Sequence, residues 1–70
     1  MKEVSFMEYM NITGYFIREK YATNRNYPNS EVDWIDKNGN VVARRAKLNN
    51  TKFSNLVDEE AYEKFVKARR

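Results

Sequence analysis

Cysteine and histidine are both absent from this sequence of 70 residues. Their absence excludes disulfides, thiol catalysis, the Ser-His-Asp and Cys-His triads, imidazole acid–base chemistry and the common zinc sites. We therefore expect no enzymatic activity, no metal and no cofactor. A chain without cysteine also fits a reducing compartment.

Glycine and proline are scarce, with Gly14, Gly39 and Pro28 the only examples. Two isolated glycines exclude a glycine-rich loop of the kind that binds phosphates. The sequence also has no long apolar run, and residues 1–5 lead into amphipathic sequence rather than into the core of a signal peptide. These features predict a cytoplasmic protein with no membrane partner.

Seventy residues leave room for a single domain, residues 1–70, with one hydrophobic core. The 41% of hydrophobic residues suffices for such a core, and their patterning argues against disorder. A core of this size typically contributes only about 3–5 kcal/mol. Since disulfides and Cys/His-bound metals are excluded, dimerisation is the remaining ordinary source of stability.

The first predicted element is a helix that begins at Ser5. Ser5 and Glu8 have the spacing of a capping box, and Val4 and Tyr9 can form the hydrophobic staple around it. Two interpretations of residues 5–22 remain open. One is a single helix through Gly14.

The apolar stripe of that single helix would consist of Phe6, Met10, Ile17 and Tyr21. In the other interpretation the first helix ends near Met10 and a second begins at Thr13, with Ile12 and Ile17 as its staple. Two staples at matched offsets favour the second interpretation.

Residues 22–30 are rich in asparagine and contain Pro28, which predicts a loop. The strongest local signal follows. Asn38-Gly39 separates two strand-like segments, residues 31–37 and 40–46, which predicts a β-hairpin with a two-residue type I′ turn. That turn would place Asp33 opposite Arg44 and Ile35 opposite Val42.

One face of this hairpin would show Val32, Trp34, Val41 and Ala43, and we expect it to pack on the helices. Trp34 is expected at the centre of the core rather than at an exposed interface. The other face, with Ile35 and Val42, would be half exposed.

The rest of the chain predicts a loop or short third strand over residues 47–55, then a helix capped by Asn55 or Asp58. The buried stripe of that helix would consist of Ala61, Tyr62, Phe65 and Val66. Acidic residues 58–60 are explained by the helix dipole rather than by metal binding. The predicted fold class is α+β: a helix or helix-turn-helix, a β-hairpin and a C-terminal helix.

The net charge of +3 and a pI near 9.3 favour polyanionic partners such as duplex DNA. If the hairpin lies beside a second helix, their basic residues form one surface for phosphates. The residues predicted to bind nucleic acid are Tyr15, Arg18, Lys20, Arg25, Lys37, Asn38, Arg44 and Arg45. Ordinary solvated charges explain the same residues equally well, because acidic neighbours reduce the positive potential.

The order of these elements resembles that of small winged-helix DNA-binding proteins of the excisionase and MerR-like kind. The matching features are a turn at Thr13-Gly14 between two helices, a wing over Asn38-Gly39 and a closing helix over residues 58–65. The resemblance implies a DNA-bending or regulatory accessory protein of phage or mobile-element type. Such a protein positions a recombinase or controls transcription.

Two hypotheses of function follow. The first is a small non-enzymatic DNA-binding accessory or regulatory protein. The second is a protein-binding module, such as a phage-encoded inhibitor of a host enzyme, which would use the hairpin face or a patch around Tyr15, Tyr21 and Tyr27.

Overall fold

A computed structural model describes residues 1–69. The elements in chain order are β1 (Lys2–Val4), α1 (Phe6–Arg18), β2 (Ala22–Asn26), β3 (Val32–Asp36), β4 (Val41–Lys47), β5 (Phe53–Val57) and α2 (Glu59–Ala68). The five strands form one antiparallel sheet in the order β1-β5-β4-β3-β2. The α+β class is therefore confirmed.

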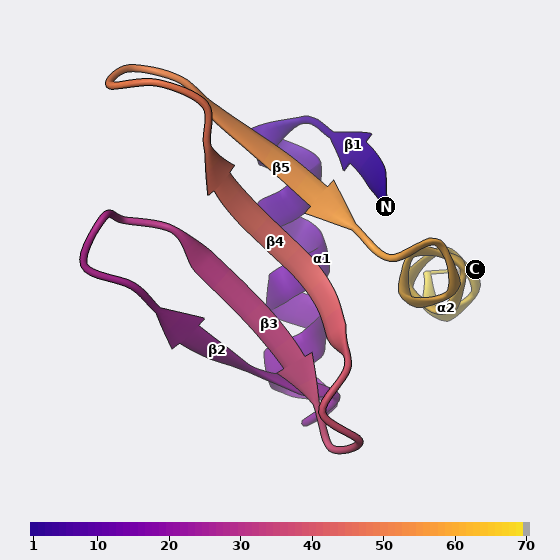
Figure 1. Cartoon of the computed structure of the whole chain (residues 1–70). Helices are drawn as coiled ribbons and strands as arrows, with labels where there is room; N and C mark the ends of the chain where they lie inside the picture. The colour runs from indigo at the N-terminus through magenta and orange to yellow at the C-terminus, as the bar shows by residue number, and fades with distance from the viewer. Residues whose placement is uncertain (70) are drawn as a thin grey trace.

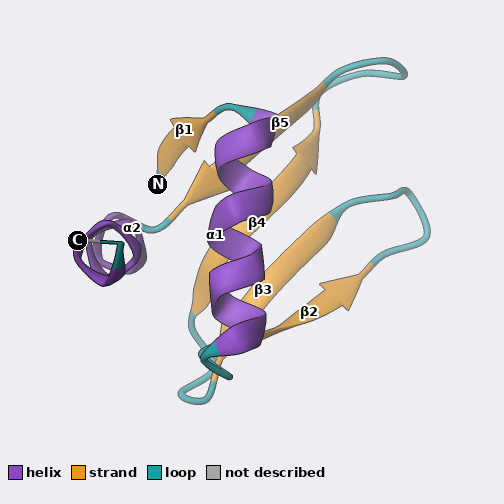
Figure 2. Ribbon diagram, turned by 180° about the vertical axis from the view of Figure 1, so that it is seen from behind, coloured by secondary structure: helices purple, strands orange, loops and turns teal. Residues whose placement is uncertain are grey.

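Helix α1 crosses one face of the sheet, as Figure 2 shows, whereas no described helix covers the opposite face, which is turned toward the viewer in Figure 1. Helix α2 lies to one side, beyond the end of β5, and is seen end-on in both views. We call the two faces of the sheet the helix face and the outer face. Neither helix in residues 1–69 has the length and apolar character needed to span a bilayer.

The first helix begins as expected, because the Ser5 Oγ accepts a hydrogen bond from the Glu8 N–H at 3.1 Å. It then continues without a break through Gly14, so the interpretation as a single helix is correct and the restart at Thr13 is wrong. The Thr13 hydroxyl donates to the carbonyl of Tyr9 at 3.0 Å instead of capping a new helix. The chain between α1 and β2 contains no second helix, so the expected helix-turn-helix is absent there.

Helix α1 ends in a Schellman motif rather than extending to residue 22. Lys20 has a φ of 52°, and the Tyr21 N–H donates to the carbonyl of Phe16 at 2.9 Å. The rings of Phe16 and Tyr21 lie 5.2 Å apart, the apolar contact that accompanies this motif. The chain therefore reverses at Lys20 and enters β2.

The stripe of α1 that faces the sheet is not the predicted one. Its buried residues are Tyr9, Ile12, Thr13 and Phe16. Phe6, Met10 and Ile17 are exposed instead. Two apolar stripes run along this helix about a quarter turn apart, and only the sheet decides which of them is buried.

Residues 22–30 are not the predicted loop. All five residues of β2 pair with β3, which overrides the weak strand propensity of asparagine. Only residues 27–30 form a turn, in which the Ser30 N–H donates to the carbonyl of Tyr27 at 3.1 Å. Pro28 occupies the second position of this turn, which its fixed φ favours.

The hairpin of β3 and β4 is confirmed, but its turn is wrong in type. Asp36 Oδ1 accepts hydrogen bonds from the N–H groups of Asn38 and Asn40, both at 2.9 Å. Gly39, with a φ of 84°, is the only turn residue here with positive φ, and its N–H donates to the carbonyl of Asp36 at 3.0 Å. The connection therefore has three residues, because the Asp36 side chain stabilises an ordinary turn before the glycine.

The register of this hairpin is correct over its first half, where Asp33 pairs with Arg44 and Trp34 with Ala43. A bulge follows, and Ile35 pairs with Val41 instead of Val42. Val42 is consequently buried rather than half exposed, whereas Val41 is only partly buried. Trp34 is 7% exposed and belongs to the core, as expected.

The structure of residues 53–69 decides between the alternatives for the third strand and for the cap of the last helix. Residues 53–57 are the short strand β5, and Asp58 is the N-cap of α2, since its side chain accepts from the Ala61 N–H at 3.2 Å. Ala61 and Phe65 are buried, with Tyr62 and Val66 packed partly buried beside them. Strand β1, which the sequence did not predict, pairs with β5.

Candidate binding surface

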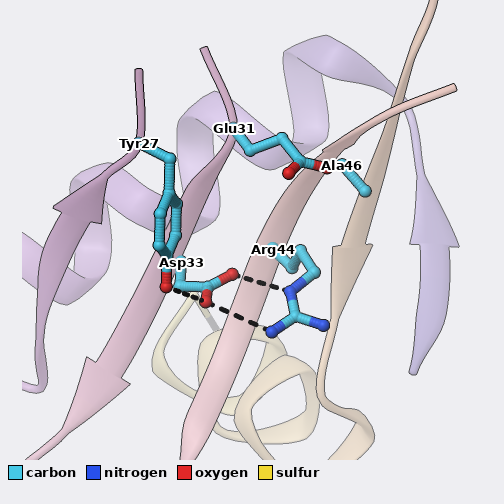
Figure 3. Close-up of a pocket in the computed structure, with 5 residues that line it drawn as sticks. All are labelled: Tyr27, Glu31, Asp33, Arg44 and Ala46. Carbon is cyan, nitrogen blue, oxygen red and sulfur yellow. Dashed lines mark hydrogen bonds and ion pairs between the residues drawn. The ribbon is translucent and has the colours of Figure 1, made fainter. Parts of the chain in front are cut away.

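The outer face of the sheet carries a polar cluster centred on Asp33, shown in Figure 3. The Asp33 carboxylate accepts hydrogen bonds from Arg44 Nε at 2.6 Å, from Arg44 Nη2 at 3.2 Å and from the Tyr27 hydroxyl at 2.9 Å. The hydrogen bonds from Arg44 hold the pKa of Asp33 below its usual value, although burial opposes the shift. The depression beside these residues is about 240 Å³ in volume, and its polar side chains are already hydrogen-bonded within the fold.

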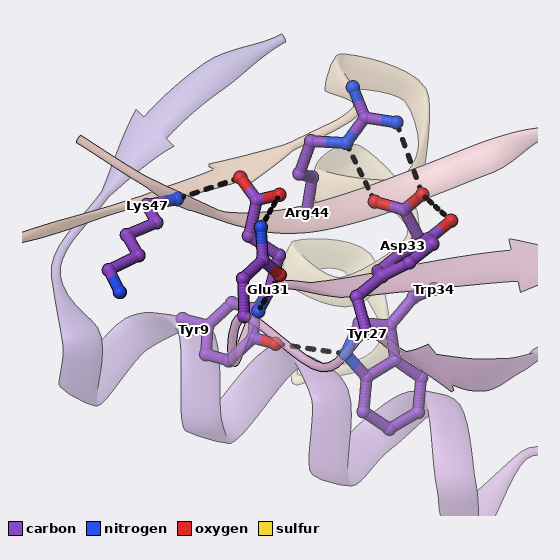
Figure 4. A network of polar contacts seen from close by, with 8 residues as sticks. Tyr9, Tyr27, Glu31, Asp33, Trp34, Arg44 and Lys47 are labelled. Atoms are coloured by element: carbon purple, nitrogen blue, oxygen red, sulfur yellow. Dashed lines mark hydrogen bonds and ion pairs between the residues drawn. The ribbon is translucent and has the colours of Figure 1, made fainter. Parts of the chain in front are cut away.

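Glu31 is equally engaged, as Figure 4 shows. Its carboxylate accepts from the backbone N–H of Lys47 at 2.9 Å and from the Asn29 amide at 2.8 Å. These bonds lower the pKa of Glu31, with the bond from Lys47 as the largest cause. Glu31 therefore ties the β2–β3 turn to the end of β4 and is not a free acid or base.

The acidic groups on this face thus serve the fold. Within residues 1–69, no group of three or more Asp or Glu side chains is arranged to hold a metal ion.

The residues predicted to bind nucleic acid are divided among several surfaces. Lys20, Lys37 and Asn38 line one depression at the end of the molecule, together with Lys64. Glu19 and Asp36 line the same depression, so its charge is mixed. Arg18 is exposed at the last turn of α1.

Arg25 and Arg44 lie on the outer face, because they pair on opposite sides of Asp33 in the sheet. Arg45 lies on the helix face, where its guanidinium stacks over the rings of Phe6 and Phe53 at 4.8 and 4.5 Å. Tyr15, expected to point outward, is partly buried against Phe65, with ring centroids 5.8 Å apart. The sheet therefore separates Arg45 from Arg25 and Arg44.

The most distinctive surface is an apolar groove between α1 and strands β2 and β3, about 490 Å³ in volume. We call it the α1–β2 groove. It is lined by Phe6, Tyr9, Met10, Thr13, Ile17, Asn24, Asn26, Val32, Trp34 and Arg45. In Figure 2 it corresponds to the side on which β2 diverges from α1.

One flank of α1 forms the wall of this groove. The groove is open because this flank has no neighbouring helix within residues 1–69, whereas the opposite flank contacts α2. On the opposite flank Tyr15 contacts Phe65 of α2, and Glu8 accepts a hydrogen bond of 2.6 Å from Tyr62 of α2. No described element covers the groove flank in the same way, so Phe6, Met10 and Ile17 are 54%, 51% and 63% exposed. Large apolar side chains of this exposure in one row mark an interaction surface.

The floor of the groove is buried and nearly free of charge. The Trp34 Nε1–H donates to the Tyr9 hydroxyl at 3.0 Å, so the indole is fully bonded (Figure 4). Burial raises the pKa of Tyr9, which keeps this phenol neutral. Arg45 is the only charged residue lining the groove.

Strand β2 borders the groove and forms one edge of the sheet. An edge strand presents unpaired backbone N–H and C=O groups to any second strand. The other edge, β1, is short and carries Lys2 and Glu3, features that discourage pairing. Strand β2 has five residues and only one charge, at Arg25, so it is the more available edge.

The sequence contained a signal for this groove in the apolar stripe of the single-helix interpretation. The predicted stripe of Phe6, Met10 and Ile17 is real, and it forms the groove wall instead of contacting the sheet. The sequence predicted a loop over residues 22–30, so it did not indicate that residues 22–26 form an edge strand.

No protein-family model, no curated protein and no solved structure matches this chain. The resemblance to winged-helix proteins consequently stays an untested prediction.

Proposed function

We propose that this chain is a protein-binding module that acts without catalysing a reaction, and that its binding surface is the α1–β2 groove. One observation carries the proposal. Phe6, Met10 and Ile17 are each more than half exposed along a single apolar groove, beside an available strand edge. Such an arrangement accepts apolar side chains in the groove and a strand or helix along its border.

We place this function in the cytoplasm, because a chain without cysteine fits a reducing compartment. The protein partner would then be a cytoplasmic one. The carboxylates of Asp33 and Glu31 on the outer face are hydrogen-bonded within the fold, which supports a role that needs no reactive group.

Site-specific photocrosslinking tests the proposal. A benzophenone amino acid in place of Met10, in the groove, is irradiated in the producing cells, and the same substitution at Asn50, in the exposed β4–β5 loop, is the control. We expect a discrete protein adduct from position 10 and none from position 50. Adducts of equal yield from both positions, or none from position 10, would contradict the proposal.

Duplex DNA binding is a second candidate, favoured by the three lysines that meet at the end of the molecule. Lys20, Lys37 and Lys64 line one depression with Asn38, and lysines grouped in this way can contact phosphates. In a gel shift at low salt, Lys20→Glu with Lys37→Glu should weaken binding at least tenfold, and added salt should weaken binding by the wild type. If the wild type retards no duplex at low salt, this candidate fails.

A further inference from the structure

We infer that the occupant of the α1–β2 groove is a second copy of this chain, joined through antiparallel pairing of the two β2 strands into a continuous sheet of ten strands. This inference rests on the proposed function, since it names the partner of the same surface. The strand edge, the helix, the charges and the interface area each support it.

The strand edge is self-complementary. A two-fold axis at Asn24, the middle residue of β2, pairs all five residues and sets Ala22 opposite Asn26 of the other copy. Arg25 then faces Thr23 of the other copy, so the two arginines do not oppose each other. The amide side chain of Asn24 both donates and accepts, which suits a residue that meets its own copy.

The exposed row on α1 has the spacing of a helix–helix contact. Phe6, Met10 and Ile17 are separated by four and seven residues, and all three are exposed and line the groove. The two-fold axis turns the second α1 antiparallel to the first. Phe6 at one end of the row therefore approaches Ile17 of the other copy, and the two flanks without a neighbour cover each other.

Charge does not oppose the contact. Arg45 is the only ionised residue of the groove, and it is already stacked between Phe6 and Phe53. An acidic or basic partner peptide would find no further charge in the groove to recognise, whereas a second apolar flank needs none.

The exposed surface beside the groove supplies part of the area that a stable dimer needs. A standard interface buries about 800 Å² per partner, which is about one sixth of the 5014 Å² of accessible surface. With about 200 Å² for a fully exposed side chain of this size, Phe6, Met10 and Ile17 offer on the order of 300 Å². The exposed residues 23–26 of β2 supply further area.

Sedimentation equilibrium of the whole chain tests the inference. We expect a mass twice the monomer value of 8.4 kDa. Met10→Glu and Ile17→Glu should each weaken association at least tenfold, because a charge would enter an apolar contact. Met7→Glu is the matched control, since Met7 is 71% exposed on the same helix but does not line the groove, and it should associate like the wild type.

Cysteine crosslinking tests the strand pairing in this cysteine-free background. Asn24→Cys on the proposed axis should form a covalent dimer on mild oxidation, and Lys2→Cys on the rival edge β1 should not. Circular dichroism checks that each variant is folded.

A chain that sediments as a monomer at every concentration overturns the inference. So does a dimer that Met7→Glu disrupts as much as Met10→Glu, or one that Lys2→Cys crosslinks instead of Asn24→Cys. The proposed function fails separately, because crosslinking from position 10 to a different protein would support it even if the purified chain is a monomer.

Discussion

Three described residues, Lys20, Ser30 and Gly39, have positive φ values, and each reverses the chain. Lys20 ends α1, Ser30 closes the β2–β3 turn and Gly39 closes the β3–β4 turn. A Cβ atom makes this left-handed conformation unfavourable by about 1–2 kcal/mol, a steric cost that glycine does not have. The fold thus uses glycine at one of these three positions and tolerates strain at the other two.

Substitution at these positions should change stability in opposite directions. Gly39→Ala should lower the free energy of unfolding by about 1 kcal/mol, because a Cβ at Gly39 meets no atom within 4 Å and only the backbone conformation costs energy. Ser30→Gly should raise it by about 0.5 kcal/mol, the relief of strain being partly offset by the greater freedom of the unfolded chain. Urea unfolding measures both, with Asn50→Gly as a control at an exposed residue without positive φ.

Asp33 should make stability depend on pH. Its pKa is lower in the folded chain than in the unfolded chain, so its contribution is complete above the unfolded value of about 4 and is lost as the pH falls through the folded value. Asp33→Asn should therefore cost about 2 kcal/mol at pH 7 and progressively less as the pH falls toward 2, because protonation of the wild-type carboxyl removes the charge that the variant lacks.

Unfolding by urea across this pH range checks the prediction for Asp33. Glu63→Gln, at an exposed residue of α2, is the control and should change stability little at either pH. An equal loss for Asp33→Asn at both pH values would show that the ionised pair with Arg44 does not stabilise the fold.

Among the elements, local signals predicted the start of α1 at Ser5 and offered Asp58 beside Asn55 as the start of α2, but they also favoured a start at Thr13 that is wrong. Ser5 and Asp58 both cap a helix with their side chains. Asp58→Ala should destabilise the chain by about 1 kcal/mol, because the N–H of Ala61 loses its partner. Relative to the wild type, hydrogen exchange in this variant should accelerate more in α2 than in β3 and β4. Unchanged exchange in α2 would contradict the capping role of Asp58.

The elements that sequence reasoning missed depend on distant partners. Residues 22–26 have little strand propensity, and only pairing with β3 makes them a strand. Residues 2–4 are too short to show a pattern, and β5 holds them. The turn at Asn38-Gly39 was placed correctly but misassigned, since two hydrogen bonds to the Asp36 side chain selected a different turn from the one that Asn-Gly favours.

The proposed binding surface was partly visible in the sequence. The row of Phe6, Met10 and Ile17 is a clear helical stripe, but α1 has a second stripe of Tyr9, Ile12 and Phe16. Periodicity identifies both stripes and does not say which one meets the sheet. The basic residues do not lie on one surface as the sequence suggested. Side chains alternate along β4, so Arg44 and Arg45 lie on opposite faces of the sheet.

At the scale of the whole molecule, the proposed association would add stability to a small core that has no disulfides. If two copies share the α1–β2 groove, the thermal midpoint of unfolding should rise with protein concentration, because mass action favours the associated folded state. Met10→Glu should unfold at a midpoint that does not change with concentration. A wild-type midpoint that is constant over a wide concentration range would contradict association.

The methyl resonances of the methionines give the most direct test of where this molecule binds. Met10 lines the α1–β2 groove and Met7 does not, although both are exposed on α1. In a dilution series of the chain labelled at its methionine methyl groups, we expect the Met10 resonance to shift with concentration and the Met7 resonance to stay fixed. Addition of lysate from the producing cells extends the test to any other partner. If Met7 shifts as much as Met10, or if Met10 responds to neither dilution nor lysate, the groove is not the binding surface.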